Sequence, residues 1–216
     1  MTDLERIFGP VAASTRCAAA MRETLEHVVQ LAVELAREGR EGRKIGTLFV
    51  IGDVEAVLEQ SQSLLLDPLY GHAEELLDVT RPEFRETVKE LAQLDGAFIV
   101  NKKGTFVSAA RYISVDPSTS LLPGLGTRHA AAASITKTTR AVAVVVSQSS
   151  IVRVYAQGEI RAEIVPELFL SRATASSRKA PTSSRCPRPA SRTPSPTARS
   201  PTFSRGGRGT RASRSV

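Results

Sequence analysis

The sequence has few cysteines and few aromatic residues. It contains two cysteines, Cys17 and Cys186, no tryptophan, and an aromatic fraction of 5%. Two cysteines without a CxxC spacing exclude a disulfide framework and a cysteine-based metal site, and they favour a reducing compartment. No segment reaches the length of about 18 apolar residues that a membrane helix needs, and the acidic first residues argue against a signal peptide. We therefore expect a soluble cytoplasmic protein without a membrane partner.

Acidic residues are absent from the C-terminal end of the chain. All 22 Asp and Glu precede residue 171, whereas 11 of the 29 Lys and Arg follow it. The formal net charge of +7 therefore originates in residues 171–216, and residues 1–170 carry a net charge of −4. An acidic body argues against a nucleic-acid-binding surface on the globular part and leaves the tail as the one candidate for such binding.

The tail also lacks Ile, Leu and Met and consists mainly of Ser, Arg, Pro, Thr and Ala. Such a chain cannot bury enough apolar surface to offset its ordering entropy, so residues 171–216 are predicted to be disordered. Three interpretations stay open: an Arg/Ser-rich nucleic-acid arm, an inert linker, and a GC-rich gene read out of frame. The abrupt change of composition after Leu170 favours the frameshift.

Helical and strand patterns alternate along residues 1–170. Apolar residues at three- and four-residue spacing predict a helix over 18–38 and another over 82–94, with Thr80 as its N-cap. Shorter helices are predicted over 54–61 and 128–139. Short runs of β-branched and apolar residues predict strands over residues 47–51, 97–100, 105–110, 141–147, 152–156 and 159–165. This mixture predicts an α/β fold with a central mixed β-sheet covered by helices.

A first candidate motif is the segment LDGAFIV, residues 94–100. Asp95 and Gly96 stand where a helix is expected to give way to a strand, which places a carboxylate at the sheet edge beside backbone that a ligand can approach closely. Such a carboxylate can hold a divalent metal or take a proton from a hydroxyl. An ordinary Asp-Gly turn is the alternative interpretation.

A second candidate motif is the segment GLGTRHAAAA, residues 124–133. Its glycines lead into an alanine-rich helix that Thr127 can cap, with Arg128 and His129 in the first turn. Cations there oppose the helix dipole, and they make sense if an anion binds to the free N–H groups and to the guanidinium. The motif lacks the GK[ST] ending of a P-loop, and a surface Arg-His pair is the alternative.

Together the two motifs resemble those of a known family. The order DGA, about 30 residues, GTRH and then a VVVS strand resembles the diadenylate cyclase domain, the family that makes cyclic di-AMP. The resemblance covers residues 44–165, and the layout is most similar to the archaeal branch. It implies a cyclase domain over 44–170, preceded by a helical segment over 1–43 and followed by the tail.

The resemblance implies a specific reaction. Each protomer of this family binds one ATP, and two protomers meet face to face. The 3′-hydroxyl of each ATP then attacks the α-phosphorus of the other, which releases two pyrophosphates. We therefore expect ATP as the substrate, Mn²⁺ or Mg²⁺ as the cofactor, and a homodimer or a higher oligomer of dimers as the active form.

The resemblance also implies roles for single residues. Asp95 would bind the metal and help to deprotonate the 3′-hydroxyl, and Gly96 and Ala97 would lie against the nucleotide. Tyr112 is a candidate from its place alone: it follows the second motif strand, where it would form a wall of the adenine site or else pack in the core. The residues expected to hold the triphosphate are Gly126, Thr127, Arg128, His129 and Ser147.

Two residues depart from the family's pattern. Ala130 stands where bacterial members have a second Arg after the His, and Gln148 stands where the family usually has Glu. We expect the first change to remove a phosphate contact, which Lys137 or Arg140 could replace, and the second to weaken the metal site while keeping an oxygen ligand. The alternative function is therefore a cyclase-like module that holds ATP or cyclic di-AMP without turnover. Nucleic-acid binding through the tail is a third.

Overall fold

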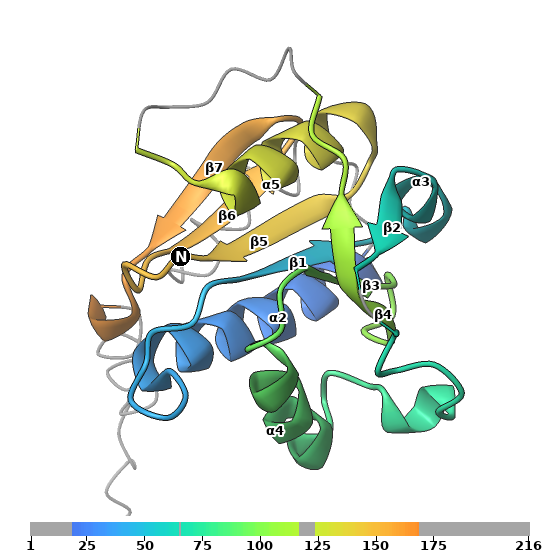
Figure 1. Cartoon of the computed structure of the whole chain (residues 1–216), viewed down its shortest axis with the longest axis horizontal. Helices are drawn as coiled ribbons and strands as arrows, with labels where there is room; N and C mark the ends of the chain where they lie inside the picture. Colours follow the sequence, from blue (N-terminus) through green and yellow to red (C-terminus); the bar gives the residue numbers. More distant parts are fainter. Residues whose placement is uncertain (1–18, 65, 117–123, 169–216) are drawn as a thin grey trace, which may run out of the picture. The chain divides into compact units, whose positions relative to one another are not determined.

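The structure, a computed structural model, describes residues 19–64, 66–116 and 124–168 (Figure 1). These residues belong to one compact unit of the chain. The tail predicted over 171–216, the two cysteines, and most of the loop before the GTRH motif lie outside the described residues. Among the helices that are described, none combines the length and the apolar character needed to cross a membrane.

Helices and strands alternate along the described chain much as the patterns predict. The helical segments are α2 (Ala19–Glu38), α3 (Val54–Glu59), the 3-10 helix η1 (Glu74–Leu76), α4 (Pro82–Leu91) and α5 (Thr127–Thr138). The strands are β1 (Thr47–Ile51), β2 (Ser61–Ser63), β3 (Ala97–Val100), β4 (Phe106–Ile113), β5 (Val142–Val146), β6 (Val152–Ala156) and β7 (Glu159–Ile164).

The strands form one mixed, seven-stranded sheet in the order β2-β4-β3-β1-β5-β6-β7. β1 and β3 are parallel, with Leu48 opposite Ala97, and the other neighbouring pairs are antiparallel. Every residue of β1 and β5 is buried, as expected for strands that are covered on both faces. The predicted α/β fold with a mixed sheet between helices is confirmed.

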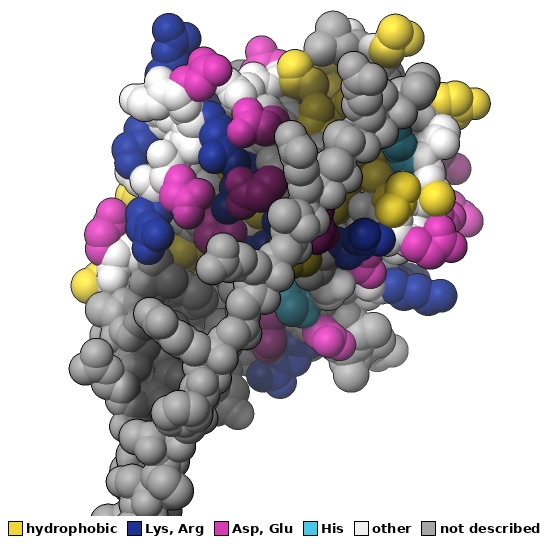
Figure 2. Space-filling view, turned by 90° about the horizontal axis from the view of Figure 1, so that it is seen from below, with side chains coloured by type: hydrophobic (Ala, Val, Ile, Leu, Met, Phe, Trp, Pro, Cys, Tyr) yellow, Lys and Arg dark blue, Asp and Glu magenta, His cyan; other side chains and the backbone are white. Residues whose placement is uncertain are grey.

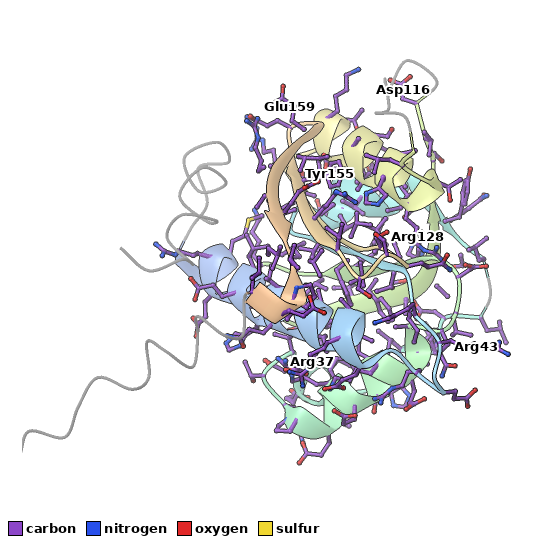
Figure 3. The ribbon with its side chains drawn as sticks, turned by 90° about the vertical axis from the view of Figure 1, so that its left-hand side faces the viewer. Arg37, Arg43, Asp116, Arg128, Tyr155 and Glu159 are labelled. Carbon is purple, nitrogen blue, oxygen red and sulfur yellow. The ribbon has the colours of Figure 1, made fainter. Side chains whose placement is uncertain are left out.

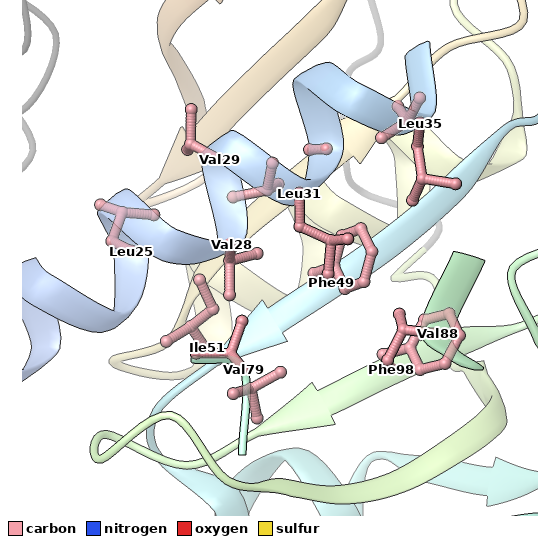
Figure 4. Packing of buried hydrophobic residues seen from close by; sticks show 14 of the residues in the cluster. Leu25, Val28, Val29, Leu31, Leu35, Phe49, Ile51, Val79, Val88 and Phe98 are labelled. Atoms are coloured by element: carbon pink, nitrogen blue, oxygen red, sulfur yellow. The ribbon is translucent and has the colours of Figure 1, made fainter. Parts of the chain in front are cut away.

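Helices α2 and α4 cover one face of the sheet, and α5 covers the other (Figure 1). On the first face the rings of Phe49 and Phe98 stack with their centroids 5.2 Å apart, and Phe106 meets both edge-on. The apolar stripe of α2 covers this layer and consists of Leu25, Val28, Val29, Leu31 and Leu35 (Figure 4). Each fully buried side chain contributes about 1.5–3 kcal/mol to the stability of the fold.

The opposite face is built from small side chains. Ala131, Ala132 and Ala133 of α5 pack on the alternate residues of the central strands, among them Val50 and Val145. Alanine has no atoms beyond Cβ, so the helix backbone can lie close to the sheet. On this face α5 contacts β1, β5, β6 and β7.

Ion pairs connect α4 to α2 and to the turn that follows α2. Lys89 is 5% exposed, and its Nζ lies within 3.3 Å of three carboxylates, those of Glu34, Glu38 and Glu86. Arg85 adds a 2.6 Å contact to Glu34, and Arg40 contacts Glu86 at 2.8 Å. The view from below shows acidic and basic side chains intermixed on one face of the molecule (Figure 2).

The predicted bounds of β1, β3 and β6 match the observed ones, and α4 begins at the predicted Pro82, whereas the predictions of its last residue and of its N-cap were wrong. The helix ends at Leu91 rather than at residue 94, and Arg81, not Thr80, is its N-cap. The hydroxyl and amide of Thr80 donate instead to Asp78 Oδ1, at 2.6 and 2.7 Å. A turn around Asp78 thus competes for the residue that the capping pattern assigns to the helix.

Tertiary pairing also creates strand where the local pattern gives none. β2 has the polar sequence Ser-Gln-Ser and was not predicted, and β4 continues to Ile113 instead of ending at residue 110. The two segments pair with each other, with Ser61 opposite Ile113. The extension carries Tyr112 and Ile113 along the sheet to the edge described next.

Candidate active site

Both candidate motifs lie at the edge of the sheet where β1 and β3 begin. β1 and β3 are parallel and β5 runs antiparallel to β1, with Thr47 opposite Val146. Residues that precede β1 and β3 therefore lie at the same edge as residues that follow β5. The topology gathers Gly46, the Asp95–Gly96 pair and Ser147 there.

An ion pair joins the two motifs. Arg128 Nη2 donates to Asp95 Oδ1 at 2.8 Å, across 33 residues of sequence. The Asp95 side chain is 86% exposed and that of Arg128 is 32% exposed. An ion pair this open to solvent contributes little to stability, so both groups are available to a ligand at small cost.

Gly96 is required by the protein backbone itself. Its φ is +109°, and a β-carbon there would lie 2.6 Å from the carbonyl carbon of Ala110 and 2.7 Å from the amide nitrogen of Arg111. The close approach accompanies a shift of register between β3 and β4 just beyond this point. Gly96 thereby fixes where Asp95 presents its carboxylate.

Two cavities flank the ion pair. The larger, of about 550 Å³, has an apolar wall of Leu64, Tyr112, Ile113 and Val115 and is also lined by Asp95, Gly96 and Arg111. The smaller, of about 190 Å³, is lined by Gly46, by the start of α5 from Gly126 to His129, and by residues 145–148. Thr127 and Arg128 line both. The larger cavity falls in the usual size range of small-molecule sites, about 300–1,000 Å³.

The start of α5 faces this region without a capping side chain. Gly126 is the N-cap, and no side chain of a described residue caps the helix. The prediction that Thr127 caps it is wrong, because Thr127 is already the first helical residue. Since Gly126 has no side chain, the N–H groups of Thr127 and Arg128 and the helix dipole are left for an anion, and the Arg128 side chain adds a full charge beside them.

With this geometry in place, comparison with known proteins identifies the family. The profile of a family described as DAC, DisA bacterial checkpoint controller nucleotide-binding, matches residues 34–160. The chain belongs to the DAC family. Both motifs, both cavities and the central strands lie inside the matched range of this DAC domain.

Two curated relatives carry the name diadenylate cyclase. The one from Methanocaldococcus jannaschii is 45% identical over 146 residues, which cover 67% of this chain and 46% of the relative. The one from Haloferax volcanii is 35% identical over 147 residues, covering 67% of this chain and 54% of the relative. The chain thus spans about half the length of these archaeal relatives. A crystal structure of DacA from Staphylococcus aureus aligns with a TM-score of 0.45 at 24% identity, covering 71% of this chain and 95% of that chain.

His129 of the DAC domain is a neutral group. It is 5% exposed, and its Nδ1 lies 3.0 Å from the hydroxyl of Tyr155. Burial, with a smaller contribution from the charge of Arg153, lowers the pKa of His129 to about 4. The expectation of two cations in the first turn of α5 is therefore wrong, since Arg128 alone is charged at neutral pH.

Neither of the two cations expected to compensate for Ala130, Lys137 and Arg140, lies near it. Ala130 is buried and lines the larger cavity. Lys137 and Arg140 lie at the other end of α5, about 15 Å along the helix from its first turn, and the Arg140 amide donates to Asp53. Neither can replace a phosphate contact beside Arg128.

The residues proposed as metal ligands line different cavities. Asp95 lines the larger cavity and Gln148 lines the smaller one. In the smaller cavity Gln148 and Arg128 both lie against Gly46, because Gln148 Cγ and Arg128 Nη1 would each be 3.3 Å from a β-carbon placed on that glycine. The described residues contain no group of three or more His, Cys, Asp or Glu that could hold a metal. Mg²⁺ is commonly bound by one or two carboxylates together with substrate phosphates, so a lone carboxylate here fits a metal that arrives with a nucleotide.

The structure gathers most of the predicted site residues. Asp95, Gly96, Tyr112, Thr127 and Arg128 line the larger cavity, and Gly126, His129, Ser147 and Gln148 line the smaller one. Tyr112 is 46% exposed, so the core alternative for it is wrong. Ala97 is the exception, because it packs under α5 in the second core cluster and lines neither cavity.

Sequence reasoning missed several residues of the site, among them Leu64, Tyr155 and Arg111. Leu64 forms part of the apolar wall of the larger cavity, and Tyr155 contacts His129 from β6. Arg111 lines the same cavity while donating to the carbonyl oxygens of Leu58 and Ser61 at the end of α3. Each is an ordinary strand or loop residue by type, and only the pairing of β2 with β4 and of β5 with β6 brings them to the site.

Proposed function

We propose that the chain is a diadenylate cyclase that condenses two ATP into cyclic di-AMP and releases two pyrophosphates. The observation that carries the proposal is the contact between Asp95 and Arg128, which places the acid of one motif and the cation of the other at the junction of two cavities. The names of the archaeal relatives support the same activity. In this proposal the cyclase domain spans residues 44–170, after a helical segment over 1–43 and before the tail.

The two cavities divide the nucleotide between them. The apolar wall of the larger cavity, with the exposed ring of Tyr112, suits an adenine base, and its volume suits a nucleoside. The smaller cavity lies at the start of α5, where free N–H groups and Arg128 suit the triphosphate. Arg128 lines both cavities and so binds near the α-phosphate, between the base and the terminal phosphates.

Asp95 serves the reacting hydroxyl. Each step joins the 3′-oxygen of one ATP to the α-phosphorus of the other and breaks the bond from that phosphorus to the pyrophosphate oxygen. The proton of the 3′-hydroxyl passes to the Asp95 carboxylate, which solvent reaches freely. Mn²⁺ or Mg²⁺, held by Asp95 and by phosphate oxygens, would neutralise charge on the phosphates. Positioning and charge neutralisation account for the catalysis in this scheme.

The reaction needs two sites that face each other. One Asp95 and one Arg128 serve one ATP, and ring closure requires a second ATP in the opposite orientation. A two-fold homodimer, or a higher oligomer of such dimers, meets this requirement. The exposure of Asp95 leaves the open side of the site free for the second protomer. We place the enzyme in the cytoplasm, where ATP is available.

The test is product formation by the full chain. Purified protein is incubated with ATP and Mn²⁺ or Mg²⁺, and the nucleotides are separated by chromatography. The wild type should form cyclic di-AMP and Asp95→Asn should form none. The matched control is Glu159→Gln, which removes another exposed carboxylate that pairs with an arginine, at 3.1 Å, far from Arg128 (Figure 3). Equal activity in wild type and Asp95→Asn would refute the role of Asp95.

A second candidate function is a binding module without turnover. Ala130 and Gln148 favour it, because Ala130 stands where the bacterial pattern has an arginine at the phosphates and Gln148 lacks the charge of the glutamate that the family pattern places at the metal. Its signature is ATP that binds to the wild type without product. Nucleic-acid binding through the tail is separated by deleting residues 171–216, which should abolish any salt-dependent binding and leave nucleotide chemistry intact.

A further inference from the structure

A buried hydrogen bond lies directly behind the smaller cavity. His129, in the first turn of α5, lines that cavity, and its Nδ1 is 3.0 Å from the hydroxyl of Tyr155 on β6. Tyr155 is 2% exposed, and the two rings lie 5.9 Å apart between centroids. Tyr155 thus contacts a site residue without lining either cavity itself.

Both partners are uncharged at neutral pH. Burial raises the pKa of Tyr155 to about 12 and lowers that of His129 to about 4. The charged groups that act on the pair are Arg153, on the same strand as Tyr155, and its ion-pair partner Glu163 on β7. The hydrogen bond therefore joins a neutral phenol to a neutral imidazole, and the imidazole exists as one of two tautomers.

The surroundings of the phenol select the tautomer. If His129 carried its proton on Nδ1, the phenol oxygen would accept it, and the phenol O–H would need a second acceptor. Among the described residues the Tyr155 hydroxyl contacts only His129. A buried donor without an acceptor is unfavourable, so the phenol donates to Nδ1 and the histidine proton resides on Nε2.

The remaining nitrogen is available to a ligand. No hydrogen bond from another described residue reaches Nε2 of His129. The buried side-chain polar atoms without a hydrogen bond in the described chain are Arg40 Nε, Thr47 Oγ1 and Ser108 Oγ, so Nε2 is not sealed in the interior. An N–H at this place, beside Arg128 and the start of α5, is a hydrogen-bond donor for an anionic oxygen.

We infer that Tyr155 is a positioning residue, whose phenol holds His129 as the Nε2–H tautomer so that Nε2 donates to a phosphate oxygen in the smaller cavity. His129 then acts as a fixed neutral donor rather than as a cation or a base. The geometry of the pair stands by itself, whereas the phosphate as ligand rests on the proposed function.

The tautomer is tested by NMR on ¹⁵N-labelled full-length protein. The chain has three histidines, and the His129 signals are those lost in His129→Gln. Long-range ¹H–¹⁵N spectra should show His129 protonated on Nε2 in the wild type and a mixture of tautomers in Tyr155→Phe. A wild-type proton on Nδ1, or an unchanged tautomer in Tyr155→Phe, would overturn the inference. This readout needs no catalysis, so it stands or falls independently of cyclase activity.

The consequence for the ligand is tested by titrating ATP in a calorimeter. Tyr155→Phe should weaken ATP binding about three- to tenfold, the loss expected when one oriented hydrogen bond to a charged group becomes disordered. Tyr70→Phe, which removes the hydroxyl of an 88% exposed tyrosine outside the cavities, should bind as the wild type does.

A double variant separates positioning from a general structural effect. In a His129→Gln background, Tyr155→Phe should cause no further loss of ATP affinity, because its effect acts through the imidazole. An equal loss in both backgrounds would show that Tyr155 acts through the fold and would refute the inference. A wild type that binds ATP, shows the Nε2–H tautomer and yields no cyclic di-AMP would refute the proposed cyclase alone.

Discussion

Replacing Gly96 by alanine tests whether the backbone of β4, and not a ligand, dictates the glycine of the DGA motif. Two costs add at this position. An alanine forced to φ +109° costs about 1–3 kcal/mol. Its β-carbon, 2.6 Å from the Ala110 carbonyl carbon, must also push β4 away from β3, which costs about 1–3 kcal/mol as for an overpacked core. We expect Gly96→Ala to lower the free energy of unfolding by about 2–6 kcal/mol.

Gly71→Ala is the matched control for the backbone conformation alone. Gly71 has φ +82°, and a β-carbon there would meet no atom within 4 Å. The strain of a positive φ, about 1–2 kcal/mol, is partly offset by the reduced entropy of the unfolded chain, so we expect a loss of about 1 kcal/mol. The difference between the two variants then reports the clash with β4.

The assay is urea denaturation of the ligand-free protein, followed by circular dichroism, with each variant compared with the wild type. A Gly96→Ala loss no larger than that of Gly71→Ala would refute the steric argument and return Gly96 to a role in ligand binding. A loss of several kcal/mol without nucleotide supports it, and would also warn that inactivity of a Gly96 variant reports folding rather than chemistry.

Three further predictions concern charged or titrating groups. Because the folded protein holds the pKa of His129 at about 4 against 6.5 in the unfolded chain, the unfolded state binds the extra proton between these values. Stability should therefore be complete above pH 6.5 and fall by about 3 kcal/mol toward pH 4, a fall that thermal unfolding of His129→Gln should not show to the same extent. Lys89→Met should lower the free energy of unfolding by about 1–2 kcal/mol at low salt and by less in 1 M salt, because the three carboxylate partners of Lys89 remain solvated. A loss of stability that does not depend on salt would contradict the ion-pair argument. Asp95→Asn should change the free energy of unfolding by less than about 1 kcal/mol while abolishing product formation, since its ion pair with Arg128 is open to solvent; strong destabilisation would show that the pair is structural.

The parts of the fold that follow from local patterns could be predicted from the sequence. β1 and β3 are short apolar runs buried on both faces, and their observed bounds are the predicted ones. The features that depend on distant partners could not be predicted. The polar β2 exists because β4 pairs with it, and Thr80 leaves its predicted cap because Asp78 accepts from it.

The same division applies to the site. Asp95 and Arg128 stand out in the sequence because an acid beside a glycine, and a cation in a first helical turn, each break a local preference. The family resemblance assigns both to one nucleotide site, but their 2.8 Å contact was not predicted. The sequence analysis identified His129 as a site residue but expected it to be a cation. Its neutral state follows from its burial against Tyr155, which depends on the pairing of β5 with β6. Arg111 and Leu64 have no local signal and enter the site only through the fold.

The position of Arg128 has a consequence for how the two cavities fill. The Arg128 guanidinium lines both cavities, and without a ligand it is paired with the Asp95 carboxylate. A triphosphate that takes Arg128 releases the carboxylate at the same moment, which frees Asp95 for the cation that accompanies the nucleotide. Each ligand thus provides the other with a freed partner, so in the proposed cyclase metal and nucleotide should bind with positive linkage: each raises the affinity for the other by the same factor. A metal alone, or a metal-free nucleotide alone, meets a site whose charges already satisfy each other.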